Sequence, residues 1–190
     1  SSSMVLDGFT ITAGAALTSG GSFRDRIGSA ILCDGAWAGA VCSPTLSNLN
    51  ITGNSSQHGP LAILASDDSG TGGQGTASPA VTTVTFNSNT VTSNGGAVYV
   101  ASGNSGATSP VFDGLVASGN AGAITGGAMS LNISGSGALV VKNSRLTGLT
   151  ATGQGGAIFF QGASGVTLDV INSLIAVSYT HLTLPTTYPV

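Results

Sequence analysis

The triplet Gly-Gly-Ala constrains the fold of this chain more than any other feature, because it returns at a nearly fixed interval before runs of β-forming residues. The triplets begin at Gly95, Gly126 and Gly155, at intervals of 31 and 29 residues. Weaker versions begin at Gly28 and Gly59, again 31 residues apart. A fixed period of this length indicates repeated units that stack and bury their apolar faces against one another.

A second motif lies upstream of the triplets and returns in the same order. Its copies begin at Leu6, Leu46, Phe86, Phe112, Val141 and Leu168. Strand alternation is clear in "AMSLNI", where polar residues separate Met129, Leu131 and Ile133. No segment has the 3.6-residue period of a helix. The sequence therefore predicts an all-β fold: a right-handed parallel β-helix, a single-stranded solenoid of about six rungs, truncated at both ends and covering residues 5–176.

The glycine triplets are explained by the corners of such a solenoid. A corner needs a positive φ and close approach of stacked backbones, and glycine meets both needs. The alanine follows where a larger side chain would collide with the next rung. An asparagine column beside the triplets suits left-handed backbone and can form an amide ladder along the stack. The predicted turn motif comprises Gly95, Gly96, Ala97, Gly126, Gly127, Ala128, Gly155, Gly156 and Ala157, with the column Asn54, Asn94 and Asn120.

The charge content excludes some classes of function. Lys and Arg total 4, Asp and Glu total 7, and charged residues make up 6% of the chain. Four scattered bases cannot form the basic surface that a phosphate backbone requires, so we expect no nucleic-acid partner. No apolar run approaches the roughly 18 residues of a membrane helix, so we expect no transmembrane segment in this piece of chain.

The last segment, 177–190, breaks the repeat pattern. It reads "VSYTHLTLPTTYPV", contains no glycine and holds two of the three tyrosines. Its first eleven residues resemble, residue by residue, the translation of a widely used transposase-type sequencing adapter. We therefore treat 177–190 as a non-native tail and exclude it from the fold.

The repeat resembles that of a known family. "FNSN" from Phe86, followed by "GGAV" from Gly95, is similar to the paired F-x-x-N and G-G-A-[ILV] motifs of the polymorphic outer membrane protein repeat. The likeness covers about residues 5–175 and extends to secreted β-helix repeat proteins. It implies a surface-displayed passenger segment, often an adhesin, that is secreted or lies at the cell surface, associated with the outer membrane if the source is bacterial.

Candidate chemistry is sparse. The acids are dispersed, and Asp67-Asp68 is the only adjacent pair. It lies in a loop-like stretch and is interpreted as solvated acids, a weak Ca²⁺ site or, less simply, a catalytic pair. We assign no catalytic residue, no cofactor and no other metal ligand. His58 has no second ligand at metal-binding spacing.

Three further features leave alternatives open. Cys33 and Cys42 either close a short disulfide loop, as in an exported protein, or remain buried free thiols. Trp37 between them serves either loop packing or a sugar platform. The charged run 24–26 is either a solvated loop with local pairing or a ligand contact.

These observations favour a non-enzymatic structural or adhesive segment of a secreted or cell-surface protein. Its low charge suits glycans or the surface proteins of host or neighbouring cells as partners, and the open ends of the isolated stack should favour self-association. The alternative is a polysaccharide lyase or glycoside hydrolase of the pectin-lyase-like β-helix type, with its active site outside this segment or degenerate within it.

Overall fold

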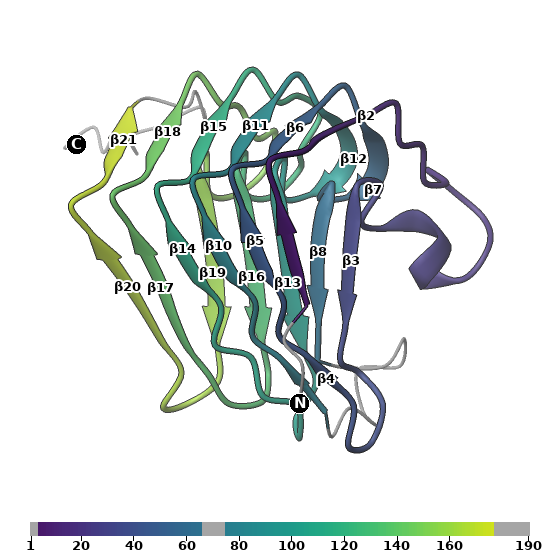
Figure 1. Ribbon diagram of the computed structural model, residues 1–190, viewed down its shortest axis with the longest axis vertical. Coiled ribbons are helices and arrows are strands. Elements are labelled where there is room, and N and C mark those ends of the chain that lie inside the picture. The colour runs from purple at the N-terminus through teal and green to yellow at the C-terminus, as the bar shows by residue number, and fades with distance from the viewer. Residues whose placement is uncertain (1–3, 66–74, 177–190) are drawn as a thin grey trace, which may run out of the picture.

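The computed structural model describes residues 4–65 and 75–176 of the 190-residue chain. These residues form a stack of short strands in which every strand pairing is parallel (Figure 1). Within the described residues the only helix is the 3₁₀ turn η1 (Phe23–Arg26). The predicted all-β parallel β-helix is therefore confirmed.

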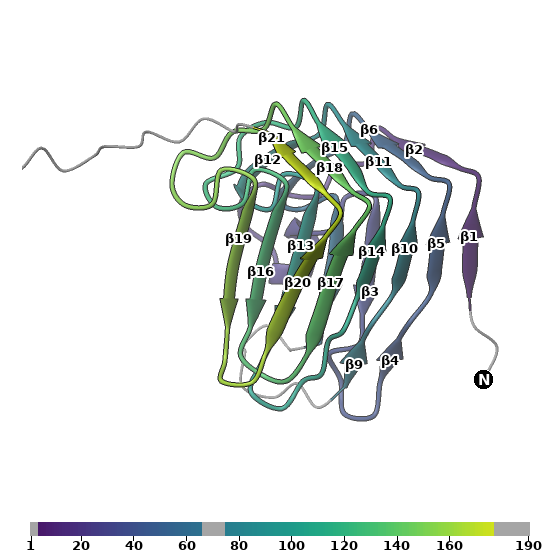
Figure 2. The ribbon, with the colours of Figure 1, turned by 90° about the vertical axis from the view of Figure 1, so that its left-hand side faces the viewer.

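Three sheets run along the stack, and each turn of the chain contributes one strand to each of them in succession (Figure 2). The first sheet consists of β1 (Val5–Asp7), β5 (Thr45–Ser47), β10 (Ala80–Thr82), β14 (Val111–Asp113), β17 (Ala138–Lys142) and β20 (Thr167–Ile171). The second consists of β2 (Thr10–Thr12), β6 (Asn50–Thr52), β11 (Thr85–Asn87), β15 (Val116–Ser118), β18 (Arg145–Thr147) and β21 (Leu174–Ala176). The third consists of β3 (Ile31–Asp34), β8 (Leu61–Leu64), β13 (Val98–Ser102), β16 (Met129–Ile133) and β19 (Ile158–Gly162).

Two shorter pairings lie between the main sheets. β7 (Ser55–His58) pairs with β12 (Thr90–Asn94), and β4 (Val41–Cys42) pairs with β9 (Thr76–Ala77). The first two sheets hold six strands each and the third holds five. The chain thus makes slightly fewer complete turns than the about six rungs predicted from the repeats, because no described strand of the third sheet follows β21.

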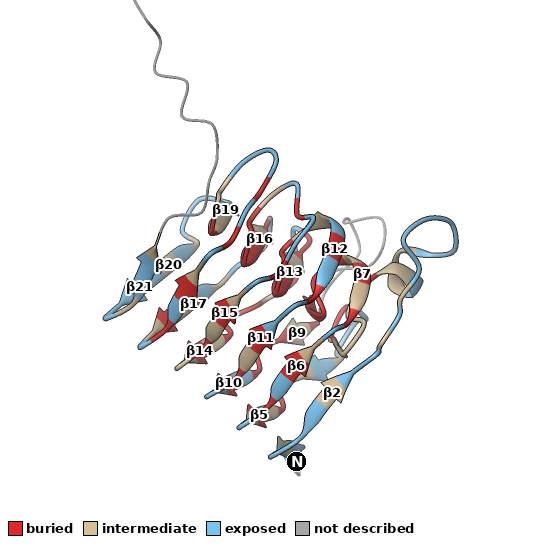
Figure 3. Ribbon diagram, turned by 90° about the horizontal axis from the view of Figure 1, so that it is seen from above, coloured by how far each residue is buried: buried red, intermediate tan, exposed pale blue. Residues whose placement is uncertain are grey.

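The core fills the interior of the stack (Figure 3). In the first sheet, parallel register places Leu46, Val81 and Phe112 on one another. In the third sheet, Met129 and Leu131 face inward with Ile133, and all three are buried as their alternation predicted. Because aligned residues point to the same side in every turn, they form a continuous apolar column. Burial of this column supplies the main stabilisation of a stacked repeat.

The corner between the first and second sheets has left-handed backbone in every turn. Its six residues have φ between 43° and 77°, and they are Gly8, Asn48, Thr83, Gly114, Asn143 and Asn172. Asparagine tolerates this conformation better than most residues, because its short amide can hydrogen-bond locally. The position itself is therefore regular, although glycine occupies it in only two of the six turns.

Candidate functional site

The Gly-Gly-Ala triplets lie at the corner that leads into the third sheet. The first glycines, Gly95, Gly126 and Gly155, have φ of 70°, 65° and 65°. At the second position, glycine is required by close contact with the next turn: a Cβ on Gly96 would overlap the carbonyl oxygen of Gly127. Gly127 is confined in the same way by the next triplet. The alanines Ala97 and Ala128 are completely buried, so both demands of the corner are visible.

The buried asparagine ladder differs from its predicted membership. Asn54, Asn89 and Asn120 occupy one column, each buried to 97% or more. Asn54 donates from its backbone N–H and its Nδ2, both at 3.0 Å, to Oδ1 of Asn89. Asn89 donates in the same way to Oδ1 of Asn120, at 3.0 and 2.9 Å. The amide ladder is therefore present.

The prediction that Asn94 belongs to this column was wrong. Asn94 ends β12, where its Oδ1 accepts a hydrogen bond of 2.7 Å from Thr125 Oγ1. The expected left-handed backbone of the column was also misplaced: positive φ belongs to the residues just before it, such as Gly53 and Ser88. The ladder asparagines also donate from Nδ2 to carbonyls of the second sheet: Asn89 to Ile51 O at 2.9 Å and Asn120 to Phe86 O at 3.1 Å.

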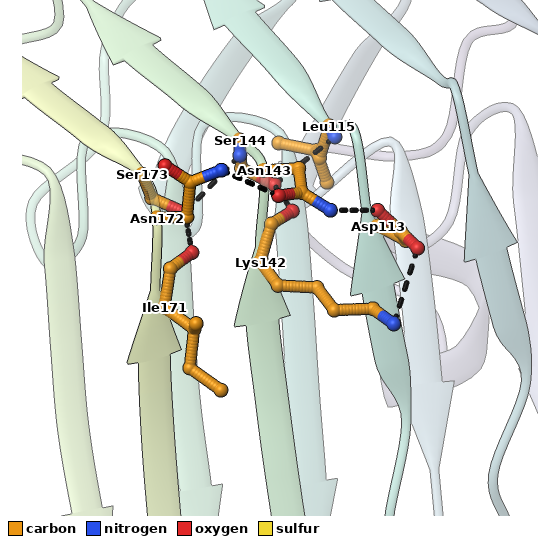
Figure 4. Close-up of polar contacts among 8 residues, drawn as sticks. All are labelled: Asp113, Leu115, Lys142, Asn143, Ser144, Ile171, Asn172 and Ser173. Atoms are coloured by element: carbon orange, nitrogen blue, oxygen red, sulfur yellow. Dashed lines mark hydrogen bonds and ion pairs between the residues drawn. The ribbon is translucent and has the colours of Figure 1, made fainter.

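A second ladder runs over the outside of the corner between the first and second sheets (Figure 4). Asn172 donates to Asn143 Oδ1, and Asn143 donates to Asp113 Oδ1, both at 2.8 Å. Lys142 Nζ lies 3.2 Å from the other oxygen of Asp113. These contacts, the Asn143 hydrogen bond first, lower the pKa of Asp113.

Serines behind this outer ladder satisfy the backbone. Ser144 Oγ accepts from the backbone N–H of Leu115 at 3.1 Å and donates to Lys142 O at 2.7 Å (Figure 4). Ser173 repeats the arrangement one turn later, accepting from the N–H of Ser144. The charged residues here are therefore engaged in holding the corner rather than gathered in a cleft.

Cys33 and Cys42 are joined by a disulfide, with their Cα atoms 5.6 Å apart. The bond connects β3, in the third sheet, to β4 at the next corner, and closes the loop that carries Trp37. Trp37 is exposed, and the guanidinium of Arg24 lies 5.0 Å from the centre of its ring. The disulfide thus fixes a loop whose aromatic side chain is covered on one face by an arginine.

The charged run 24–26 forms η1 and folds against the outside of the stack. Arg24 Nε lies 2.7 Å from Asp34 Oδ2 at the end of β3. Asp25 accepts hydrogen bonds of 2.8 and 2.9 Å from the backbone and side chain of Ser22, which lower its pKa. Arg26 lies over the ring of Phe23. Local pairing, one of the two predicted alternatives, is what these contacts show.

Phe23 brings η1 onto an aromatic cluster on the outward side of the third sheet. His58 lies 4.8 Å from Tyr99 and 5.4 Å from Phe23, measured between ring centres. His58 is 8% exposed, and its Nδ1 has no hydrogen-bond partner. Burial, and secondly the positive charge of Arg26, lower the pKa of His58 to about 4. Burial raises the pKa of Tyr99 to about 12, so both rings are uncharged at neutral pH.

Beyond this cluster the outward face of the third sheet opens into a groove of about 610 Å³. Tyr99 borders it, and Asn132 and Gln161 lie on neighbouring strands as direct register partners. Asn104 and Ser134 come from the loops that follow the strands. None of the described residues that line the groove is charged. The repeat pattern gave no signal for this site, since its residues come from three different turns.

Other predicted sites are not brought together. Asp67 and Asp68 lie outside the described residues, as does the tail 177–190. Among the residues that the structure describes, no group of three or more His, Cys, Asp and Glu side chains is arranged to hold a metal ion. Within the same ranges no helix has the length and hydropathy needed to cross a membrane.

Comparison with known proteins found no match: no family model, no curated protein and no solved structure is significantly similar to this chain.

Proposed function

We propose that this chain is a non-enzymatic, adhesive segment of a secreted or cell-surface protein, similar in design to the passengers of the polymorphic outer membrane protein family. The observation that carries the proposal is the uncharged groove on a rigid stack of strands. Its walls offer amides and a tyrosine edge, which are groups that bind a partner without transforming it. Glycans and the surface proteins of neighbouring cells are the partners that such a surface suits.

The carbohydrate-cleaving alternative requires different chemistry. Hydrolysis of a glycosidic bond uses two carboxyl groups about 5 to 9.5 Å apart across the bond. None of the described acids lines the groove. Asp113 belongs to a corner ladder, Asp25 caps η1 and Asp34 pairs with Arg24. The arrangement around the groove therefore favours recognition over cleavage.

The test compares binding with cleavage in the same preparation. The 190-residue chain, fixed to beads, is exposed to bacterial, algal and animal cells, and separately incubated with pectin and neutral polysaccharides in the presence of Ca²⁺. We expect cell binding without release of unsaturated or reducing sugars. Sugar release would establish the enzymatic alternative, and the absence of binding to every cell type would refute an adhesive role.

Self-association through the ends of the stack is part of this proposal. Leu174 and Ile175 in β21 are 53% and 46% exposed, and Val170 in β20 is 44% exposed. An unpaired strand edge with apolar side chains is a template for pairing with another chain. We expect Leu174→Lys to reduce oligomers in light scattering, whereas Ile124→Lys, at an exposed loop position away from that edge, leaves them unchanged. Equal effects of the two variants would contradict an end-to-end contact.

A further inference from the structure

The outward face of the third sheet is divided into a covered half and an open half. Over the early turns, Phe23 of η1 packs on Tyr99 and His58, and a small apolar cluster with Ala62 and Leu64 is buried beneath the same segment. Towards the ends of β16 and β19, Asn132 is half-buried and Gln161 is exposed, whereas Ser130 further up β16 is buried. Tyr99 stands at the boundary, so the groove begins where the covering segment ends.

The open half carries a row of solvent-accessible amides. Asn132 and Gln161 are register partners on adjacent parallel strands, so their backbones are about 4.8 Å apart and their side chains point the same way. Neither amide, nor that of Asn104, hydrogen-bonds to another described residue. Each can donate two hydrogen bonds and accept two. Together they form a short array of donors and acceptors along the stack axis.

The chemistry of this array selects its ligand. Hydroxyl groups both donate and accept, as amides do, so a chain of sugar hydroxyls pairs with the row in either direction. An anionic ligand would find no cation among the described lining residues, and a cationic ligand would find no carboxylate. Tyr99, protonated through the physiological range, borders the row with an apolar ring edge and a neutral hydroxyl.

We propose that the groove bordered by Tyr99, Asn104, Asn132 and Gln161 binds an uncharged oligosaccharide. The inference rests on the proposed adhesive function and gives it a site and a ligand class. The volume of about 610 Å³ lies within the range of about 300 to 1,000 Å³ typical of small-ligand sites. Asn132 and Gln161 supply the hydrogen bonds that orient the sugar, and neither is needed for the core.

The test uses the 190-residue chain on an array of neutral and acidic oligosaccharides, followed by calorimetric titration with the best neutral ligand. The Asn132→Ala/Gln161→Ala double variant should bind at least about tenfold more weakly, because it loses two hydrogen-bonding groups. The matched control is Asn87→Ala, which removes an exposed amide from the second sheet. Circular dichroism establishes that both variants keep the fold.

Each other outcome overturns the inference in a recognisable way. Binding to acidic glycans alone contradicts the neutral ligand class. Neutral binding that survives the double variant but is lost in Trp37→Ala places the site at the disulfide loop instead. Cell binding without any glycan binding refutes the sugar ligand and leaves the adhesive function standing. Failure to bind both cells and glycans refutes the proposed function as well.

Discussion

Replacing Asn89 by alanine tests whether the buried amide ladder stabilises the stack. The Asn89 side chain accepts two hydrogen bonds from Asn54 and donates to Ile51 O at 2.9 Å and to Asn120. The variant leaves the backbone N–H of Asn54 without an acceptor, where Asn54 is only 1% exposed. Asn54 Nδ2 still reaches the carbonyl oxygens of Ile11 and Thr52, both at 3.1 Å. An orphaned buried polar group costs about 1 to 3 kcal/mol.

One orphaned donor therefore predicts a loss of about 2 kcal/mol in the free energy of unfolding. For a chain of this size, 1 kcal/mol shifts Tm by about 2 to 4 °C, so Tm should fall by about 6 °C. Thermal and urea unfolding, followed by circular dichroism, measure the change. The control is Asn87→Ala, an exposed asparagine two residues earlier whose Oδ1 accepts only from Ser88 Oγ.

A loss in Asn89→Ala no greater than about 0.5 kcal/mol beyond the control would refute this reasoning. It would mean that the ladder bonds are exchanged for equally good bonds to water. Asn89→Asp separates the two halves of the effect. Its carboxylate still accepts from the Asn54 N–H, but it cannot donate to Ile51 O and faces the Asn120 oxygen.

Three further predictions concern the corners, the aromatic cluster and the disulfide. Gly127→Ala places a Cβ against a carbonyl of the next turn and should lower the free energy of unfolding by about 1 to 3 kcal/mol. Gly148 has a φ of 61° and open space around it, so Gly148→Asn should lower it by less than about 1 kcal/mol. Urea titrations measure both changes. Folding lowers the pKa of His58 from 6.5 to about 4, so as pH falls the unfolded chain binds a proton at His58 before the folded chain does. The free energy of unfolding should therefore be at its full value above pH 6.5 and fall by up to about 3 kcal/mol as pH drops to 4. His58→Phe should remove this part of the pH dependence, and an unchanged dependence in that variant would contradict the prediction. Cys33→Ala/Cys42→Ala should lose about 2 to 3 kcal/mol and become insensitive to reductant, whereas reductant should destabilise the parent chain by a similar amount.

The repeat, its corners and the all-β class were predictable because their causes are local. A glycine pair before β-forming residues indicates a corner with positive φ and close backbone approach wherever the pair occurs. Strand alternation in 129–133 likewise specifies which side chains face the core. The parallel stack follows from these demands and the period alone.

Membership of the asparagine ladder was not predictable in this way. The stretch "FNSNTVTSN" offers asparagines at 87, 89 and 94, and each has a similar local environment in the sequence. Only the register of β11 on β6 decides that Asn89 is buried on Asn54 while Asn87 is exposed. Register is set by packing across turns, which a single unit does not reveal.

The groove was hidden for a related reason. Asn132 and Gln161 are 29 positions apart, and each alone is an unremarkable outward residue of a strand. Their pairing requires the register, and the boundary at Tyr99 requires the position of η1, a segment without periodicity. Sites assembled from several turns therefore become visible only when the turns are stacked.

The amide ladder implies an order in which the turns of the stack are stabilised during folding. Asn54 in one turn completes its hydrogen bonds only when Asn89 of the next turn is in place, and Asn89 in turn waits for Asn120. In a chain that emerges from a ribosome or an export pore with its amino end first, each new turn would lack part of its ladder hydrogen bonds until the next turn has formed. The most recently formed turn is thus the least stable one, and the turns before it become fixed one after another.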